Sequence, residues 1–431
     1  MRPILGVAVA AALTFATSSP ARSQTSPSTL TADDAVREAL DANRDLQAAR
    51  LAIDVARGGW LQAGRLDNPE LEAFYADDFA FHADGERVAS VGFAQRFPIA
   101  ARLTREADVA EQEVAIAEAE VRDFVRTLVA EVQSAFFSVR ALDERLGVNR
   151  QLIESVRQVE EATVRRLEAA EVSPAEVSLL RIERLRLEQD AQRLVREREI
   201  AAAALTRLLG RTAPAGLTPV GELDPGPIPA PSVAAVDSQD RPDLEAARRA
   251  IERADAGRAL ARAEVWEDWT VGLGYERERQ VFDAPIGTQR DSLLALGVAV
   301  PLPLWNRQQG RIAAAEAELH RSRRARDALV LRIEEEIRAA EARVRTLRSS
   351  VDAYAGEILP EATRSQELFE RGYRQGLVRI AELLQAQRQY NESRALYLEL
   401  LGDLRRATIE LEAATGASPH LNEKRSQGGT P

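Results

Sequence analysis

Cysteine is absent from this chain of 431 residues. Its absence excludes disulfides, thiolate metal sites and lipid attachment at an N-terminal cysteine. The three histidines, at positions 82, 320 and 420, are far apart in the sequence, so we expect no dedicated transition-metal site. Neither a Walker loop nor a Gly-rich dinucleotide motif occurs. The sequence therefore predicts no cofactor and no enzymatic activity.

Lysine and aromatic residues are also scarce. Lys424 is the only lysine, aromatic residues make up 5% of the chain, and charged residues make up 29%. This balance is typical of long amphipathic helices rich in Ala, Glu, Leu and Arg. The net charge of -11 argues against nucleic-acid binding, which requires a basic face. After the first two dozen residues no run of about eighteen apolar residues follows, so no helical membrane span is expected.

The N-terminal segment has the features of a secretory signal. Met1 and Arg2 precede an apolar run over residues 4–15, and small residues follow over 17–23. The apolar run is too short to span a bilayer. We therefore expect residues 1–23 to be a signal peptide, with cleavage near Ser23, and the protein to be exported.

The remaining sequence contains the same order of similar segments twice, about two hundred residues apart. The segment 44–50 returns at 241–248, the segment 91–102 returns at 296–307, and Gly210 returns as Gly416. Each half reads as a helix, two short strands and a very long helical hairpin. We therefore predict a mainly α protein with a small β part, built from two tandem repeats.

The predicted organisation has four parts after the signal peptide. They are a first repeat (24–210, with strands at about 69–77 and 88–97 and a hairpin at about 100–210), a Pro-rich connector (211–237), a second repeat (238–416, with strands at about 268–276 and 291–300 and a hairpin at about 308–415) and a disordered tail (417–431). The first helix is expected to continue to Leu61, and a later one to run unbroken from Gly310 to Tyr373. Between Leu103 and Glu171 there is no proline, which predicts a helix of roughly 100 Å.

The strands alternate between two kinds of side chain. Trp269, Val271, Leu273 and Tyr275 share one face, whereas residues 270, 272, 274 and 276 are small or polar. This pattern is typical of an outer-membrane barrel, with lipid outside and water inside, although two soluble hairpins with one buried face are the alternative. Tryptophans at 266, 269 and 305, near the strand ends, suit a membrane interface.

Four strands cannot close a barrel, because the smallest bacterial barrels have about eight and open edges do not survive in lipid. A membrane-embedded chain must therefore oligomerise. A dimer would give about eight strands with a filled interior, whereas a trimer would give about twelve with room for water. The trimer would make a channel.

Two local motifs, together with the doubled plan, carry a resemblance to a known family. The first is the turn 373–386, in which a tyrosine and a glycine precede the acidic and hydrophobic start of a helix, and its counterpart in the first half is 166–177. The second is the strand-to-helix junction from Pro301 to Gly310. With the doubled plan, these segments make the chain resemble the TolC family of outer-membrane efflux proteins, in its CzcC-like, heavy-metal branch. Alanine in place of the usual glycine, and Pro174, are departures in the first turn.

The resemblance implies a homotrimer in the outer membrane of a Gram-negative cell, surrounded by lipid. A twelve-stranded barrel would be continuous with a periplasmic α-helical barrel, whose tip docks onto a periplasmic adaptor (membrane fusion) protein and an inner-membrane RND-type pump. The residues that correspond to the docking tip are Tyr373, Gly376, Leu377, Val378, Arg166, Leu167, Ser173 and Pro174. Those that correspond to the narrow periplasmic entrance are Glu382, Gln385 and Glu176, and Gln385 replaces a carboxylate of the family.

The function implied is a passive duct that exports divalent heavy-metal cations. Three copies of Glu382 at a constriction would favour cations over anions, although a solvated helix charge is the plainer interpretation of that residue. Drug or solvent efflux and type I protein secretion stay open as cargo. A periplasmic adaptor or a structural coiled coil is the alternative of another class, but neither explains two hairpins combined with four alternating strands.

Overall fold

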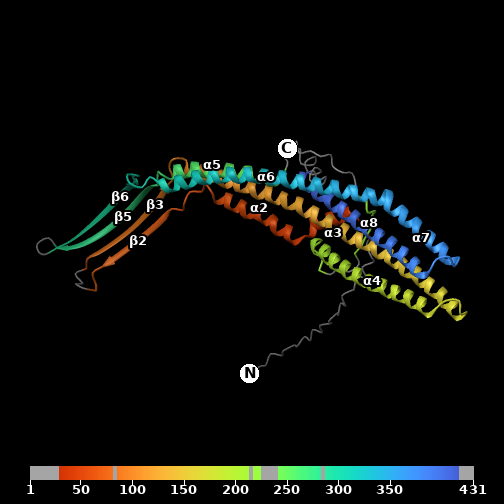
Figure 1. Ribbon diagram of the computed structural model, residues 1–431. Helices are drawn as coiled ribbons and strands as arrows, with labels where there is room; N and C mark the ends of the chain where they lie inside the picture. Colours follow the sequence, from red (N-terminus) through yellow and green to blue (C-terminus); the bar gives the residue numbers. More distant parts are fainter. Residues whose placement is uncertain (1–28, 81–84, 213–216, 225–240, 283–286, 417–431) are drawn as a thin grey trace, which may run out of the picture.

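The computed structural model describes residues 29–80, 85–212, 217–224, 241–282 and 287–416. The molecule is elongated, with a sheet at one end and long helices that run away from it to two helical turns at the other end (Figure 1). The expected signal peptide and the expected tail lie outside the described residues, and the connector is described only in part.

The first half contains most of the length of the molecule in one helix. Its elements are β1 (Thr29–Leu30), α1 (Ala32–Ala42), α2 (Arg44–Gln62), β2 (Glu70–Asp77), β3 (Arg87–Phe97), α3 (Arg102–Glu168) and α4 (Pro174–Leu208). The 67 residues of α3 give a length of about 100 Å. The expected single helix up to Leu61 is wrong in its continuity, because Asn43 ends α1 and its side chain accepts from Leu46 N to begin α2.

The second half repeats the plan with one interruption. Its elements are α5 (Pro242–Ala263), β5 (Trp269–Phe282), β6 (Gly287–Ala299), α6 (Gln309–Ala353), α7 (Leu359–Arg374) and α8 (Ile380–Thr415), whereas the short β4 (Thr218–Pro219) lies in the connector and pairs with β1. A π-helical turn, Tyr354–Ile358, separates α6 from α7, so the expected unbroken helix from Gly310 to Tyr373 is wrong. Pro360 explains the break, because proline inside a helix removes a hydrogen bond and clashes with a preceding carbonyl. Within the described ranges, no helix is both long and apolar enough to cross a membrane.

Each half is closed by a side chain at its start that binds a carbonyl at its end. Asn43 Nδ2 donates to Leu208 O at the C-terminus of α4, over 2.8 Å. Arg241 donates to Ala414 O at the C-terminus of α8, also over 2.8 Å. Both side chains are buried, so each satisfies a helix-end carbonyl that water does not reach. The two repeats therefore share this closure of their last helix.

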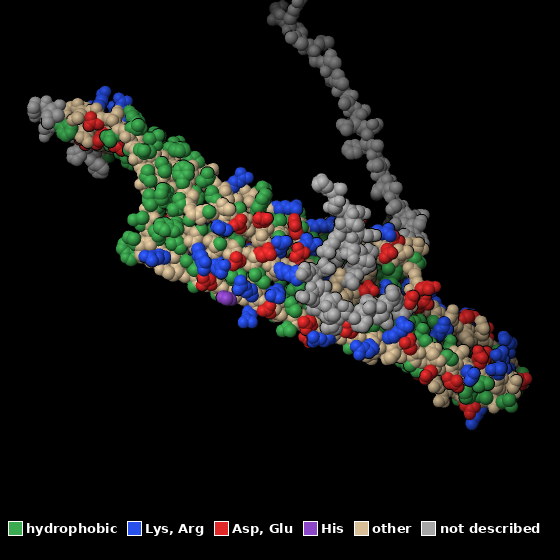
Figure 2. Space-filling model, turned by 90° about the horizontal axis from the view of Figure 1, so that it is seen from above, with side chains coloured by type: hydrophobic (Ala, Val, Ile, Leu, Met, Phe, Trp, Pro, Cys, Tyr) green, Lys and Arg blue, Asp and Glu red, His purple; other side chains and the backbone are tan. Residues whose placement is uncertain are grey.

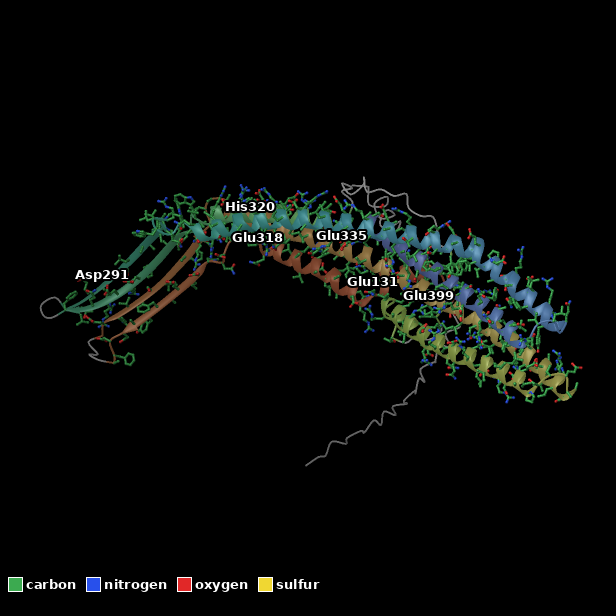
Figure 3. The ribbon with its side chains drawn as sticks, viewed as in Figure 1. Glu131, Asp291, Glu318, His320, Glu335 and Glu399 are labelled. Atoms are coloured by element: carbon green, nitrogen blue, oxygen red, sulfur yellow. The ribbon has the colours of Figure 1, made fainter. Side chains whose placement is uncertain are left out.

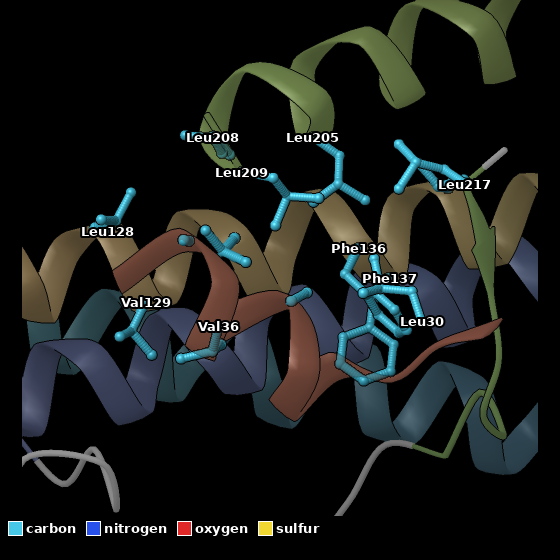
Figure 4. Close-up of a cluster of buried hydrophobic side chains, with 14 of the residues drawn as sticks. Leu30, Val36, Leu128, Val129, Phe136, Phe137, Leu205, Leu208, Leu209 and Leu217 are labelled. Carbon is cyan, nitrogen blue, oxygen red and sulfur yellow. The ribbon is translucent and has the colours of Figure 1, made fainter. Parts of the chain in front are cut away.

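The largest core lies where α1, α3 and the end of α4 meet (Figure 4). Phe136, Leu205 and Val36 are almost fully buried there. A second cluster joins α6 to α8, and a third joins α3, α4 and the start of α8 near the tip. Because α3 contacts α4, α5 and α8, it links the two halves along the whole stalk.

The four long strands form one antiparallel sheet in the order β2-β3-β5-β6. The two central strands come from different halves, and β2 and β6 are its two edges. β5 and β6 extend beyond the expected ranges 268–276 and 291–300, because their pairing continues from Glu276↔Leu293 to Phe282↔Gly287. The pairing of these strands thus continues beyond the apolar alternation from which the strands were predicted.

Candidate functional site: the sheet wall and the helical tip

One face of the sheet is apolar in the part nearer the helices. Residues that lie opposite one another in register include Leu71, Phe93, Leu273 and Leu296 in one row and Ala73, Val91, Tyr275 and Leu294 in the next. Leu296 is 74% exposed, and the other large side chains of these rows are also exposed. Hydrophobic side chains accordingly cover the sheet end of the molecule in Figure 2. A continuous exposed apolar face of this kind requires an apolar neighbour.

The opposite face carries carboxylates among small residues. Glu70, Glu72, Glu276, Glu278 and Asp291 share this face with Gly92, Gly272, Gly274 and Gly297. Within the described strands its one basic residue is Arg96, which pairs with Glu70 at 2.8 Å. The face is therefore acidic, although Phe74 and Leu293 in the row of Glu276 are exposed apolar side chains on it.

Aromatic residues border the apolar band at both ends. Phe97 and Trp269 are paired at the end next to the helices, and Tyr75 and Tyr275 lie toward the loop end. Trp305, in the junction between β6 and α6, is 88% exposed. Aromatic girdles at both interfaces are a feature of strands that span an outer membrane.

The two helical turns at the far end have the same backbone geometry. In the second turn Gly376 has a φ of 72°, and Leu377 N donates to Gly372 O over 2.8 Å. In the first turn Ala170 has a φ of 61°, and Glu171 N donates to Arg166 O over 2.9 Å. A left-handed residue in this position ends a helix, and glycine adopts it without strain. The alanine that replaces the expected glycine keeps the conformation, at a steric cost.

The predicted docking residues fall on both sides of these turns. Leu377 is 77% exposed, and Val378 packs so closely over Gly372 that a Cβ there would come within 2.6 Å of Val378 Cγ2. Ser173 and Pro174 are exposed at the start of α4, and Leu167 is half-buried. The turns therefore present a mixed apolar and polar surface at the end of the molecule.

Tyr373 joins the two turns. Its hydroxyl lies 3.3 Å from Thr163 Oγ1 on α3, and Arg166 Cζ lies 5.7 Å from the centre of its ring. The tip cluster of Val156, Leu180, Ile380, Leu383 and Leu384 packs beside it. The sequence motif placed Tyr373 and Arg166 at the tip, but it did not indicate that they touch.

The predicted entrance residues have ordinary helix-start roles in the single chain. Glu382 Oε2 accepts from Arg379 N over 3.0 Å, and its other oxygen lies 3.9 Å from the Arg379 guanidinium. Gln385 is exposed one turn further along α8, and Glu176 is half-buried in the first turn of α4. Glu382 thus caps α8 and remains about half exposed to solvent.

The buried ion pairs near the tip were not predicted from the sequence. Glu183 on α4 has a side chain that is 5% exposed, and its carboxylate accepts from Arg388 Nε on α8 over 2.8 Å. These hydrogen bonds raise the pKa of Arg388 above its ordinary value. Glu160 on α3 is bound by Arg184 at 2.8 Å and Arg181 at 3.4 Å. The signal was present, because Glu183 interrupts the buried apolar positions of α4, at residues 177, 180 and 187.

The remaining acidic residues and His320 are scattered. Figure 3 shows Glu131, Glu318, His320, Glu335 and Glu399 spread along the stalk, with Asp291 on the sheet. In the part of the chain that the structure describes, no group of three potential ligands could hold a metal ion.

An exposed apolar face, an acidic opposite face and a long helical stalk together define a segment of a membrane channel. The outer membrane efflux protein family matches residues 35–211 and 238–417, so the chain belongs to this family, the TolC family. It is an efflux channel of the outer membrane that extends into the periplasm, and such channels are transport proteins, not enzymes. This membership excludes the adaptor and structural coiled-coil alternatives.

Individual relatives agree with the family. The chain is 25% identical, over 388 residues and 90% of each sequence, to the cobalt-zinc-cadmium resistance protein CzcC of Cupriavidus metallidurans. Its fold is similar to that of CusC, in a structure described as showing transmembrane channel formation (TM-score 0.74, 19% identity, 89% of this chain and 91% of that one). It is also similar to the outer membrane channel CmeC of Campylobacter jejuni (TM-score 0.72, 12% identity, 99% and 98%).

Proposed function

We propose that the protein is the outer-membrane duct of a tripartite, RND-type efflux system, and that three copies form it. The observation that carries this proposal is a four-stranded sheet with an apolar face and two open edges, β2 and β6. Unpaired edges are not tolerated in lipid, so each edge must pair with another chain. Three chains would close a barrel of about twelve strands, wide enough for water.

The lateral faces of the stalk support the same assembly. On α2, Leu51 is 61% and Val55 is 76% exposed, and on α4, Ile182 is 60% exposed. Large apolar side chains at successive turns of a helix are typical of a face that packs against a neighbour. A ring of three chains would bury them and continue the barrel as a helical tube into the periplasm.

In this assembly the two turns point into the periplasm, where an adaptor protein and, through it, an inner-membrane pump would engage them. The exposed Leu377, Ser173 and Pro174 would form part of the docking surface, together with the half-buried Arg166, Leu167, Tyr373 and Val378. Glu382, Gln385 and Glu176 would lie near the entrance. Three copies of Glu382 would concentrate negative potential there.

The proposed cargo is a divalent heavy-metal cation. The similarity to a cobalt-zinc-cadmium resistance protein over 90% of both chains supports it. The acidic sheet face supports it independently, because rings of carboxylates in a water-filled pore favour cations. Glu72, Glu276, Glu278 and Asp291 would each occur three times around the lumen.

The test compares a deletion strain with its complemented parent on zinc, cobalt, cadmium, nickel and copper, beside organic antimicrobials and solvents. Sensitivity confined to metals is the expected result. Sensitivity confined to organic compounds would refute the cargo and indicate a drug or solvent duct. Loss of a secreted polypeptide without any sensitivity would instead indicate type I secretion.

A variant then examines the entrance. Glu382→Gln removes the charge but keeps an amide oxygen that can accept from Arg379 N, so α8 remains capped. The matched control is Glu410→Gln on the same helix, far from the tip, where the carboxylate pairs with Arg343. Reduced metal resistance in the first variant alone is expected. Equal resistance in both would remove Glu382 from the proposed entrance.

A further inference from the structure

The apolar face of the sheet ends in arginines. Arg87, Arg279 and Arg290 are direct register partners on β3, β5 and β6, and they therefore form one row across three neighbouring strands. At about 4.8 Å between strands, the row is roughly 10 Å wide. Arg277 lies on the same face one step toward the apolar band, and Asp77 continues the row on β2. We call Arg87, Arg279 and Arg290 the arginine row.

Such a row is unfavourable by itself, because like charges directly opposite one another on a sheet repel. The neighbouring carboxylates have other partners. Asp77 accepts from the Tyr75 hydroxyl over 2.8 Å, and Glu86 accepts from Val281 N over 3.3 Å. Other nearby acidic groups bond elsewhere as well: Asp78 accepts from Gly85 N, Glu278 from Gln280 and Asp291 from Gln289, the last two on the opposite face.

Two of the three arginines have little compensation nearby. Arg87 contacts the Tyr75 hydroxyl as well as lying beside Asp77. Arg279 Nε is buried, and within the described residues it has no hydrogen-bond partner. Arg290 lies on the edge strand and is exposed. Among the described residues of this face, the row therefore sets three guanidinium groups against one aspartate, with the Arg279 guanidinium lying against Gly85 and the exposed Arg290 leaving donors at the edge.

The height of the row places it at a membrane boundary. Trp269, in the inner aromatic row, and Arg279 are ten residues apart on β5. Ten residues span about 34 Å along a strand, or about 26 Å along the membrane normal at a tilt near 40°. The outward apolar band of such barrels is about 25 Å tall. In the proposed barrel the arginine row therefore lies just beyond the outer aromatic border of Tyr75 and Tyr275, at the boundary of the hydrocarbon away from the periplasmic helices.

We propose that the arginine row binds the phosphate groups of an anionic lipid in the outer leaflet. Guanidinium groups bind phosphate oxygens in pairs, and a site next to hydrocarbon strengthens the attraction. Only one register row, which holds Arg277 and Ser292, separates the arginine row from Leu294, so one ligand can place acyl chains on Leu294 and Leu296 and its phosphates on the arginines. This proximity to apolar side chains favours a lipid head group over free phosphate. Binding would also offset the repulsion within the row.

The experiment uses the full-length protein, purified in a non-ionic detergent, with bis-phosphorylated lipid A as the probe. Native mass spectrometry measures the bound lipid for the parent and for Arg87→Gln/Arg279→Gln/Arg290→Gln. We expect the triple variant to retain at least about fivefold less lipid, as loss of charge-assisted pairs at three positions requires. Arg290→Gln alone, at an exposed position, serves if the triple variant does not fold, and should lose about twofold.

The control removes the same charge elsewhere. Arg37, Arg207 and Arg321 have side chains that are 72%, 67% and 77% exposed, and all three lie on helices. Their triple change to glutamine should retain lipid as the parent does. Equal retention by all variants would overturn the proposal. Displacement of the lipid by an equal concentration of inorganic phosphate would also overturn it, because the row would then be an ion site and not a lipid site.

Discussion

Replacing Arg388 with glutamine tests the ion pair that bridges α4 and α8 near the tip. The change leaves the Glu183 carboxylate, 5% exposed, without the guanidinium that now binds it over 2.8 Å. Removing one partner of a fully buried pair costs about 3–5 kcal/mol, because the remaining charge is stranded. Arg388 itself is 43% exposed, so solvent screens part of the interaction. We therefore expect a cost below that range, of about 2 kcal/mol.

The appropriate assay is local, because unfolding of a whole membrane protein need not be two-state. Hydrogen exchange of the amides of α4 near Glu183 reports the free energy of local opening. A loss of about 2 kcal/mol corresponds to exchange that is faster by roughly 30-fold. The amides of residues 200–208, at the other end of α4 in the main core, should keep their rates.

Arg181→Gln is the matched control for this prediction. Arg181 is 62% exposed and lies 3.4 Å from Glu160, which keeps its closer partner Arg184. Its loss should cost at most about 1 kcal/mol, as for an exposed ion pair. If Arg388→Gln changed the exchange near Glu183 by no more than Arg181→Gln does, the pair would not hold the two helices together.

Three further predictions concern the turns and the ends of the repeats. Ala170→Gly should stabilise the first turn by about 1 kcal/mol in local hydrogen exchange, since the alanine has a φ of 61°, and Gly376→Ala should have the opposite effect; equal effects of one sign would contradict this. Glu412→Gln should raise the hydrogen-exchange protection of the amides near residue 412 at neutral pH, because burial raises the pKa of Glu412 against the opposing charge of Arg405. Because the pKa of Glu412 is raised in the folded state, the contribution of its side chain to stability is fully present below the ordinary pKa of 4.5 and is lost as the pH rises. The stabilisation by Glu412→Gln should therefore vanish near pH 4, and a stabilisation that is independent of pH would refute the prediction. Asn43→Ala should lower the free energy of local opening at the start of α2 by about 1–3 kcal/mol in hydrogen exchange, since it leaves Leu208 O and the first turn of α2 without their buried partner; unchanged exchange rates there would refute this.

The sequence anticipated the features that rest on periodicity. Apolar alternation located the core of each strand, and the absence of proline located α3. Alternation could not give the length of β5, because Arg277 to Phe282 lies beyond the apolar band while the backbone ladder continues. Pro360 did signal the break after α6, but a helical period on both sides of it concealed that signal.

The tip was harder to predict, because its residues act across helices. The motif placed Tyr373 and Arg166 at the turns, but the contact between them depends on how two hairpins pack. Glu183 is the clearest case. A single acidic residue in an apolar helix face indicates a buried partner, yet nothing in one sequence identifies Arg388, which lies two hundred residues further along the chain.

The doubling of the chain has a consequence for symmetry. In a ring of three copies, six equivalent hairpins would surround the axis, and a partner would meet nearly sixfold symmetry at the tip. The two turns are not identical, however, because Ala170 takes the place of Gly376. The tip would therefore offer two kinds of site, three of each. A partner protein could occupy one kind, or occupy both in two different orientations, without any change in its own sequence.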